Sequence, residues 1–323
     1  MRAVRCHELI GPKGLRVDEI DPPKPSSHDV LIETRAAGVN FPEVLLAYGK
    51  YQFKPAPPFI PGGEVAGVVR EVGAAVTSLK PGDRVAATMI HGAFAEQVVV
   101  PELAAVKLPD AVSFEVGAAT LLTYLTTYHA LVDRAHLRSG ESLLVLGAAG
   151  GVGVAAVQLG KMLGAKVIAA ASTDAKIAFA KAQGASDGIV YGREDLKERA
   201  KALSGSGFDV IYDPVGGPYS EQALRAIGWE GRFLVVGFAH GDIPKIPLNL
   251  TLLKGCQIVG VFWGQFAMRE PERNRANGAL IFEAVAEGKL APHVDAVFPF
   301  AEAAAALLKM ERREVLGKLV LVP

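Results

Sequence analysis

The amino-acid sequence predicts an α/β protein in which a β-rich N-terminal domain precedes a doubly wound parallel sheet. Short strand-like runs separated by turn residues fill about the first 110 positions. From Leu143 to about Phe262, apolar runs alternate with helical patterns, and a glycine-rich turn joins the first run to its helix. This alternation is typical of a parallel α/β sheet. The length of 323 residues favours two domains.

The N-terminal part contains six strand candidates, which are separated by turn sequences such as GPKG, DPPKP, PGG and PGD. They are Ala3–His7, Leu15–Ile20, Asp29–Ala36, Val65–Val72, Arg84–Thr88 and Ala95–Val100. Regularly spaced short strands are typical of a barrel-like or Greek-key domain. One short helix, Pro42–Gly49, begins with a proline and ends at a glycine.

After a helical stretch from Phe114 to Leu131, strands alternate with helices. The strand candidates are Leu143–Ala148, Lys166–Ala171, Gly188–Tyr191, Phe208–Asp213, Phe233–Phe238 and Ile258–Phe262. The helices expected between them are Val152–Leu163, Asp174–Gln183, Asp195–Leu203 and Tyr219–Ile227. This succession predicts a doubly wound sheet with strand order 3-2-1-4-5-6. The chain then ends with helices at about 272–288 and 301–313 and strands at Val294–Phe298 and Lys318–Val322.

Composition limits the compartment and the partners. Lys+Arg and Asp+Glu both number 34, and this balance argues against a nucleic-acid partner or an acidic membrane surface. Cys6 and Cys256 are the only cysteines and form no disulfide framework, which favours a reducing compartment. The N-terminus lacks the apolar core of a signal peptide, and no apolar run reaches transmembrane length. We therefore expect a cytoplasmic protein.

The glycine-rich turn predicts a dinucleotide site. Gly147, Gly150 and Gly153 follow an apolar run and open a helix of small residues. Glycines permit a tight turn and let backbone N–H groups approach a pyrophosphate at the positive end of the helix. In the G-x-G-x-x-G pattern, alanine takes the place of the first glycine. The candidate pyrophosphate-binding residues are Ala148, Gly150, Gly151, Val152 and Gly153. The alternative is a βαβ unit that binds no nucleotide.

The second strand of this unit ends in AAAST, without the carboxylate that usually holds the ribose hydroxyls of NAD. Ser172, Thr173 and Lys176 offer hydroxyls and an ammonium group that suit a 2′-phosphate. The sequence therefore favours NADPH over NADH. The alternative is that Ser172 and Thr173 cap the next helix while Lys176 is solvated, and both interpretations can hold together.

Several motifs, taken in order, resemble the zinc-free, zeta-crystallin-like quinone-oxidoreductase branch of the medium-chain dehydrogenase/reductase superfamily. They are AAGVNFPEVLLAYGKY (36–51), PFIPGGEVAGVVREVG (58–73), PGDRV (81–85), GAFAEQVVV (92–100), TTYHAL (126–131), LVLGAAGGVGVAAVQL (144–159), YDPVGG (212–217) and the terminal GKLVLVP. The resemblance implies a GroES-like catalytic domain at 1–122, completed by about 290–323. It further implies a Rossmann-type NADPH-binding domain at 123–289, with the active cleft between the two domains. It also implies a homodimer or tetramer that pairs through about Gln257–Phe262.

The resemblance also bears on metal binding. Zinc-dependent relatives place a cysteine where this chain has Asn40 and a histidine where it has Gly63. Only Cys6 lies in the first 250 residues, so the four close cysteines of a structural zinc site are missing. We expect no metal. Without a Lewis acid, the protein is suited to electrophilic acceptors such as quinones and α,β-unsaturated carbonyls, which need orientation and a donor to the developing oxyanion.

Asn40, Tyr51 and Thr126 correspond to family positions that line the nicotinamide and the substrate. Asn40 can donate from its amide, and the Tyr51 phenol can hydrogen-bond or protonate an enolate. The family pattern has a tyrosine where this chain has Leu45, so a mechanism using that tyrosine does not transfer. The structural alternatives are a turn for Asn40 and simple packing for Tyr51.

Five more residues are expected at the cofactor site, namely Tyr191, Gly216, Phe238, Trp263 and Lys318. Tyr191 and Lys318 follow from the resemblance, whereas Gly216 follows the fourth strand and Phe238 ends the fifth, at the carboxyl edge where such sheets bind ligands. Trp263 follows the sixth strand and is expected to wall the substrate pocket. Tyr191 corresponds to a position near the adenosine or its 2′-phosphate, and Phe238 is expected to approach the nicotinamide. The alternatives are a core or edge aromatic for Tyr191, an interface residue for Trp263 and a solvated lysine for Lys318.

The expected function is therefore that of an NADPH:quinone oxidoreductase. One alternative is a reductase of enoyl-CoA substrates of the acryloyl or crotonyl type, for which only a loose basic rim is present, formed by Lys50, Lys54, Arg269 and Arg273. Another is an NADPH-binding structural or regulatory protein with little turnover. The sequence lacks the G-x-S-x-G elbow of a serine hydrolase.

Overall fold

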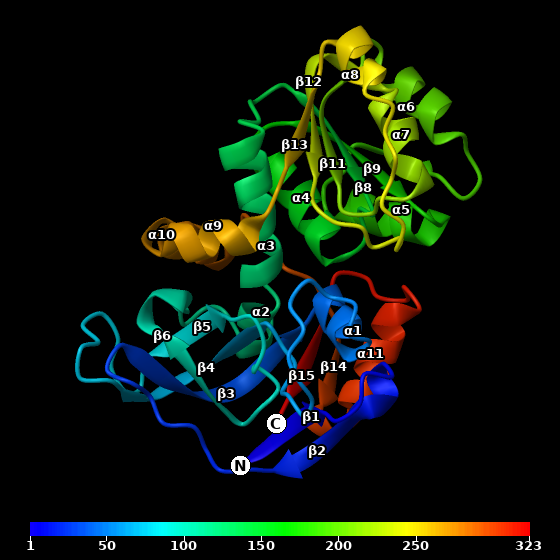
Figure 1. Cartoon of the computed structure of the whole chain (residues 1–323). Coiled ribbons are helices and arrows are strands. Elements are labelled where there is room, and N and C mark those ends of the chain that lie inside the picture. The colour runs from blue at the N-terminus through cyan, green and yellow to red at the C-terminus, as the bar shows by residue number, and fades with distance from the viewer. The chain divides into compact units, whose positions relative to one another are not determined.

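The computed structural model describes all 323 residues, and the chain divides into two compact units (Figure 1). The first unit consists of Met1–Leu122 together with Ala267–Pro323, and the second is Thr123–Phe266. The chain returns to the first unit at Ala267, earlier than the position of about 290 that the resemblance implied. Helix α10 (Pro271–Ala286) belongs to this return, and its Gly278 packs closely against Val106 of the first unit.

The first unit is built mainly on antiparallel strands. β1 (Arg2–Cys6) and β2 (Leu15–Glu19) form a two-stranded sheet. A seven-stranded sheet has the order β14-β15-β3-β4-β5-β7, and β6 pairs with β3. Its strands are β3 (Asp29–Val39), β4 (Glu64–Val72), β5 (Arg84–Thr88), β6 (Gln97–Pro101), β7 (Ala105–Lys107), β14 (Val294–Pro299) and β15 (Lys318–Val322). Only β14 and β15 pair in parallel. The last strand of the chain thus completes a sheet that begins near residue 29.

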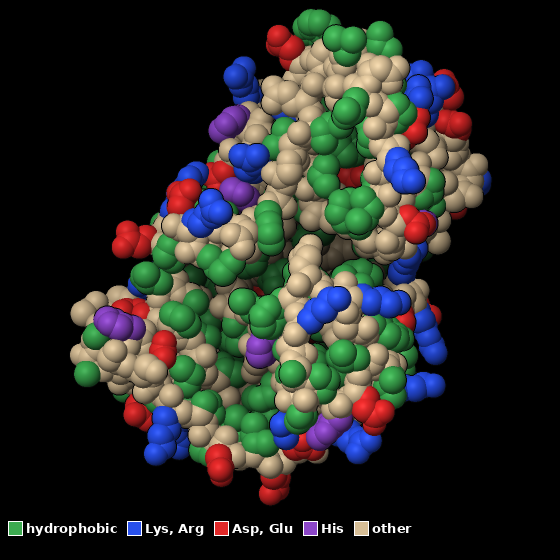
Figure 2. All heavy atoms as spheres, in the orientation of Figure 1, with side chains coloured by type: hydrophobic (Ala, Val, Ile, Leu, Met, Phe, Trp, Pro, Cys, Tyr) green, Lys and Arg blue, Asp and Glu red, His purple; other side chains and the backbone are tan.

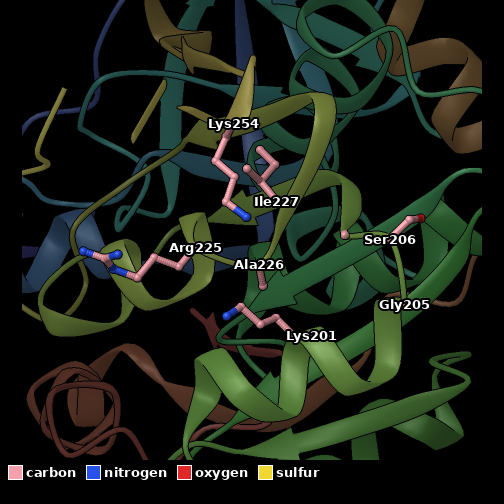
Figure 3. A pocket seen from close by; sticks show the side chains of 8 residues that line it. Lys201, Gly205, Ser206, Arg225, Ala226, Ile227 and Lys254 are labelled. Atoms are coloured by element: carbon pink, nitrogen blue, oxygen red, sulfur yellow. The ribbon is translucent and has the colours of Figure 1, made fainter. Parts of the chain in front are cut away.

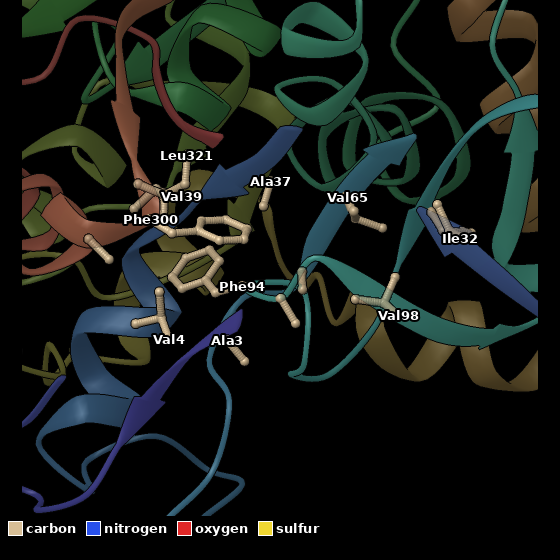
Figure 4. Close-up of a cluster of buried hydrophobic side chains, with 14 of the residues drawn as sticks. Ala3, Val4, Ile32, Ala37, Val39, Val65, Phe94, Val98, Phe300 and Leu321 are labelled. Carbon is tan, nitrogen blue, oxygen red and sulfur yellow. The ribbon is translucent and has the colours of Figure 1, made fainter. Parts of the chain in front are cut away.

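One hydrophobic cluster joins the two chain segments of the first unit. Figure 4 shows Phe94 and Phe300 close together, with Val4, Val39 and Leu321 around them. Burying a side chain of this size contributes roughly 1.5–3 kcal/mol to stability. The C-terminal residues of this cluster come from a short 3-10 turn, from α11 (Ala303–Glu311), which follows that turn, and from β15. The core of the first unit therefore requires the end of the chain.

The second unit contains a six-stranded sheet with the order β10-β9-β8-β11-β12-β13, in which every pairing is parallel. Numbered from β8, this is the order 3-2-1-4-5-6, so the predicted doubly wound sheet is confirmed. The strands are β8 (Ser142–Leu146), β9 (Lys166–Ala171), β10 (Asp187–Val190), β11 (Phe208–Asp213), β12 (Ile227–Val235) and β13 (Gln257–Gly260).

Helices flank this sheet (Figure 1). They are α4 (Gly151–Met162), α5 (Asp174–Ala182), α6 (Leu196–Ser204), α7 (Pro218–Leu224) and α8 (Asn249–Lys254). Because the helices cover the sheet, the central strand β8 is a continuous apolar run and is fully buried from Leu143 to Leu146. The parallel strands direct their carboxyl ends to one edge, where the glycine-rich turn follows β8.

The structure contains elements that the sequence did not predict, including β7 and α8, and two predicted elements differ from the prediction. The helical stretch from Phe114 to Leu131 is α2 (Phe114–Ala118), α3 (Leu121–Tyr128) and a π-helical segment, His129–Arg134. Thr120 Oγ1 donates to the Val116 carbonyl at 2.6 Å, a local bond of the kind that bends helices, and the break falls there. The fifth strand of the second unit begins at Ile227 instead of Phe233, because the backbone continues through an irregularity opposite Phe208.

Nowhere in the chain does a helix combine the length and the hydropathy required to cross a bilayer.

Candidate active site and cofactor site

The loop between β8 and α4 has the geometry of a dinucleotide-binding turn. Gly147 adopts a φ of +61°, and its carbonyl accepts a hydrogen bond from the Gly150 N–H at 3.0 Å. No side chain caps the first N–H groups of α4, which begins after Gly150. A Cβ on Gly153 would overlap the Gly147 carbonyl oxygen, so this close approach requires glycine. Uncapped N–H groups at a positive helix end favour an anion.

The residues predicted to bind pyrophosphate all lie in this loop or in the first turn of α4: Ala148, Gly150, Gly151, Val152 and Gly153. The Ala148 N–H donates to the Ala170 carbonyl of β9 at 3.1 Å, which ties the loop to the sheet. Gly153 lets α4 pack closely on this loop, and the uncapped N–H groups at the start of α4 fit the pyrophosphate of a dinucleotide.

Two neighbouring loops follow β9 and β10 at the same sheet edge. The Tyr191 N–H donates to the Ala171 carbonyl at 3.1 Å, and a Cβ on Gly192 would lie 3.1 Å from the Ser172 carbonyl oxygen. Thr173 is the N-cap of α5 and accepts from the Lys176 N–H at 3.3 Å, so the capping interpretation of Thr173 is confirmed. The structure thus brings together all four predicted 2′-phosphate residues: Ser172, Thr173, Lys176 and Tyr191.

This edge also contains an ion pair that sequence reasoning missed. The Arg193 guanidinium donates to both carboxylate oxygens of Asp174, at 2.8 and 2.9 Å. The Tyr191 ring packs on the Tyr219 ring with centroids 4.3 Å apart. The only sequence signal for Arg193 was its position two residues after Tyr191.

The loop after β11 is organised by a buried carboxylate that was not named from the sequence. Asp213 accepts hydrogen bonds from the N–H groups of Val215 at 2.8 Å and Gly216 at 2.9 Å, and from Ser220 Oγ at 2.5 Å. Burial raises the pKa of Asp213, and these three donors oppose that shift. Gly216 has a φ of +72°, and a Cβ there would lie 2.9 Å from the Phe238 ring. The predicted cofactor residues Gly216 and Phe238 are therefore neighbours.

The first unit holds a buried polar cluster around Asn40. The Lys318 ammonium donates to Glu64 Oε2 and to the Val39 carbonyl, both at 3.1 Å, and to Asn40 Oδ1. Lys318 is 3% exposed and Glu64 is fully buried. The interpretation of Lys318 as a solvated lysine is therefore wrong. Because Lys318 holds Oδ1, the donor end of the Asn40 amide is Nδ2, which makes a long contact of 3.4 Å with the Gly38 carbonyl. The Asn40 side chain also hydrogen-bonds Glu64 and opposes the rise in its pKa.

Glu43 adds a second carboxyl group to this cluster. It belongs to helix α1 (Phe41–Ala47) and accepts from the N–H groups of Asn40 at 2.7 Å and Gly63 at 2.9 Å. Burial raises the pKa of Glu43 to about 7, against the opposing effects of the Lys318 charge and these N–H donors. Burial also raises the pKa of Glu64, and its ion pair with Lys318 opposes that shift. One ammonium group thus faces two buried carboxyls.

The predicted catalytic residues are divided between the two units. Asn40 and Tyr51 lie in the first, together with Lys318, whereas Thr126 lies in α3 of the second. Burial and the Glu43 charge raise the pKa of the Tyr51 phenol, which favours its protonated form. Trp263 is in the second unit, where it begins α9 (Trp263–Arg269) after β13.

The second unit has a separate basic pocket of about 190 Å³. It is lined by Lys201, Gly205, Ser206, Gly207, Arg225, Ala226, Ile227 and Lys254 (Figure 3). It lies at the amino ends of β11 and β12, the sheet edge opposite the cofactor loops. Lys201 and Lys254 lie in the last turns of α6 and α8, where cations stabilise the negative helix ends.

Comparison with known proteins agrees with this arrangement. Residues 26–110 match the family described as alcohol dehydrogenase GroES-like domain, and residues 151–277 match the family described as zinc-binding dehydrogenase. A quinone oxidoreductase-like protein 2 homolog of Nematostella vectensis is 38% identical over 99% of this chain and 88% of its own length. The chain belongs to the quinone-oxidoreductase branch of the medium-chain dehydrogenase/reductase superfamily.

Solved structures of this family extend the likeness to the whole fold. The Escherichia coli quinone oxidoreductase complexed with NADPH is 31% identical, with a TM-score of 0.93 and complete coverage of both chains. The quinone oxidoreductase of Pseudomonas syringae pv. Tomato DC3000 is 33% identical, with a TM-score of 0.92, covering 100% of this chain and 99% of that chain. The predicted combination of a GroES-like domain and a Rossmann-type sheet is confirmed.

One family description mentions zinc, but the side chains of this chain do not form a metal site. No group of three or more His, Cys, Asp or Glu side chains in this chain is placed to hold a metal ion. The two positions that the resemblance connects with zinc ligands carry the Asn40 amide, held by Lys318, and Gly63, whose N–H is bonded to Glu43.

Proposed function

We propose that this protein is an NADPH-dependent quinone reductase that works without a metal ion. The proposal rests mainly on one observation, the buried Lys318–Asn40–Glu64 network in the catalytic unit. Zinc-dependent relatives place metal ligands at this region of the sequence, whereas here an ammonium group orients an amide. An amide donor suits an electrophilic carbonyl and cannot replace a Lewis acid for alcohol oxidation.

NADPH, when bound, supplies a hydride. The glycine-rich turn, with Ala148, Gly150, Gly151, Val152 and Gly153, holds the pyrophosphate. Ser172, Thr173, Lys176 and Tyr191 hold the 2′-phosphate and adenosine end. In the second unit, Gly216, Phe238 and Trp263 border the nicotinamide end. In the first unit, Lys318 orients the Asn40 amide. This division follows the loops at the carboxyl ends of the parallel strands, which is where such sheets bind ligands.

On the acceptor side, Asn40 Nδ2 donates to the quinone oxygen that gains negative charge. The Tyr51 phenol, which burial keeps protonated, supplies a proton to that oxygen and is reprotonated from solvent. Thr126 lines the substrate. Reduction of the quinone to the hydroquinone consumes one hydride and one proton, and the Tyr51 phenol supplies that proton. An α,β-unsaturated carbonyl is an acceptor of the same kind.

We further propose that the protein is a homodimer, with a tetramer as a larger assembly, and that it is cytoplasmic. β13 is the edge strand of its sheet, and exposed apolar side chains lie beside it, including Phe262. Trp229 is 75% exposed and Leu252 of α8 is 81% exposed. Figure 2 shows hydrophobic side chains gathered over α8 at the top of this view. An unpaired strand edge with apolar neighbours favours pairing with a second copy.

The assembly is tested by light scattering after size exclusion. The double variant Leu252→Glu with Phe262→Glu should convert the dimer to a monomer. Leu103→Glu, an exposed leucine of the first unit, is the matched control and should leave the dimer intact. A monomeric wild type contradicts the proposed assembly.

The free thiols of Cys6 and Cys256 support the proposed cytoplasmic location, because the cytoplasm is a reducing compartment.

The activity is tested by following NADPH oxidation with ortho- and para-quinones, alkenals and enoyl-CoA thioesters. We expect turnover with quinones, with conjugated alkenals as secondary acceptors. Asn40→Ala should lower kcat about 100-fold if its amide stabilises the developing oxyanion. Turnover confined to enoyl-CoA would replace the quinone assignment, and tight NADPH binding without any turnover would indicate a binding protein.

A further inference from the structure

The loops that follow β9 and β10 lie side by side, and an ion pair between Arg193 and Asp174 joins them. The backbone bond from Tyr191 to Ala171 holds the two loops together, so that Arg193 reaches Asp174 at the start of α5. Both bonds of this ion pair are short, at 2.8 and 2.9 Å, and both side chains are largely exposed to solvent. The guanidinium therefore meets a carboxylate in the parallel, two-bond geometry that it also adopts with phosphate.

Asp174 raises an electrostatic difficulty for a 2′-phosphate. It is the first residue of α5 and immediately follows Ser172 and Thr173, which are proposed to contact that phosphate. A helix N-terminus stabilises the Asp174 carboxylate, but this charge repels a phosphate bound to the same turn. Arg193 neutralises the carboxylate, and Lys176 adds a second cation in the first turn of the helix.

We propose that Arg193 is a further 2′-phosphate ligand and that Asp174 competes with the phosphate for it. The inference rests on the proposed function as an NADPH-dependent enzyme and names a residue pair that sets its preference for NADPH. The Asp174 carboxylate occupies the guanidinium fork until the phosphate, which carries more charge and three acceptor oxygens, displaces it. An exposed guanidinium–carboxylate pair changes an equilibrium by at most about fivefold, so the displacement is easy.

A competing interpretation assigns Asp174 a different role. An acidic residue after the second strand can hold the ribose hydroxyls of NADH, and Asp174 lies three residues after the end of β9. In that case the Asp174 carboxylate favours NADH by direct contact with the ribose hydroxyls, and Arg193 only orients this carboxylate. The two interpretations predict opposite results for the removal of Asp174, so they can be distinguished.

The test uses the full-length protein and measures dissociation constants of NADPH, NADH, 2′-AMP and 5′-AMP by isothermal titration calorimetry. Arg193→Ala should weaken NADPH and 2′-AMP roughly ten- to fiftyfold and leave NADH and 5′-AMP within about twofold. Arg193→Lys, which keeps the charge but loses the fork, should give an intermediate loss. Asp174→Asn should tighten NADPH and 2′-AMP about two- to fivefold, because Arg193 is released.

Arg225→Ala is the matched control. Arg225 is also a partly exposed arginine paired with a carboxylate, Glu221 at 2.6 Å, but it precedes β12 at the opposite edge of the sheet. It should change none of the four constants. A thermal melt of each variant verifies that it is folded.

Equal weakening of NADPH and NADH by Arg193→Ala would overturn the proposal. Selective weakening of NADH by Asp174→Asn would also overturn it and would establish the ribose-binding interpretation. These readouts need no acceptor, so a negative quinone assay leaves the proposal standing. If the wild type binds 2′-AMP no better than 5′-AMP, both this inference and the NADPH assignment fail, whereas the likeness in fold remains.

Discussion

Replacing Glu43 by glutamine removes a buried titratable group while keeping its size and one acceptor oxygen. Glu43 is 1% exposed, and burial raises its pKa to about 7. A glutamate in an unfolded chain titrates at about 4.3. Between these two values the folded protein binds a proton that the unfolded chain has already lost. Wild-type stability must therefore fall as the pH rises through this interval.

The size of the fall follows from the width of the interval. Each pH unit inside it lowers the free energy of unfolding by about 1.4 kcal/mol, and the whole interval by about 3–4 kcal/mol. Above a pH of about 7 the carboxyl is ionised in both states, and Glu43 causes no further loss. Glu43→Gln has no such titration, so its stability relative to wild type should rise by about 3 kcal/mol from acid to mildly alkaline pH.

The assay is urea unfolding followed by far-ultraviolet circular dichroism, at several pH values between about 5 and about 8. Glu71→Gln is the matched control, because Glu71 is an exposed glutamate on β4 of the same unit. Its stability difference from wild type should stay constant across the series. A constant difference for Glu43→Gln as well would refute the reasoning, since it would mean that Glu43 titrates alike in the folded and unfolded states.

Three other changes test the buried Lys318 network, the glycine-rich turn and the independence of the activity from metal. Lys318→Met should lower the free energy of unfolding by about 3–5 kcal/mol, because the Glu64 charge stays buried without its partner. The double variant Lys318→Met with Glu64→Gln should lose less free energy of unfolding than the sum of the two single variants, as measured in a double-mutant cycle. Gly153→Ala should abolish NADPH binding in a fluorescence titration, because its Cβ overlaps the Gly147 carbonyl, whereas Gly264→Ala, whose Cβ would meet no atom closer than 3.6 Å, should bind normally. Protein freed of metal by a chelator should keep its full quinone reductase activity, and a loss that added zinc restores would contradict the metal-free mechanism.

The architecture of the second unit could be predicted because each of its parts leaves a local pattern in the sequence. A strand covered on both faces becomes a continuous apolar run, as in β8. The turn after it requires glycines for its backbone geometry, as Gly147 and Gly153 demonstrate. The end of β9 lacks a carboxylate, and this local feature allowed the preference for NADPH to be predicted from the sequence. These signals extend over a few residues, so the order of elements and the location of the nucleotide turn follow from the sequence.

The polar cluster of the first unit leaves no such pattern. Lys318 is 278 positions from Asn40 and 254 positions from Glu64. A lysine that opens an apolar strand is usually exposed, so the sequence alone favoured the solvated alternative for Lys318. The Arg193–Asp174 pair was missed for a related reason. Its partners are 19 positions apart, and only the neighbouring strands β9 and β10 bring their loops together.

The register of β15 explains how the end of the chain builds the catalytic unit. Leu319 pairs with Val39 across the antiparallel β15 and β3, which places Lys318 beside Asn40. Leu319 and Leu321 belong to the hydrophobic core, so Lys318 lies on the opposite face of its strand. A shift of one residue would move both leucines out of this core and turn the ammonium away from Glu64. The same burial that stabilises the first unit therefore also positions Asn40, and this site can form only after the last strand has docked.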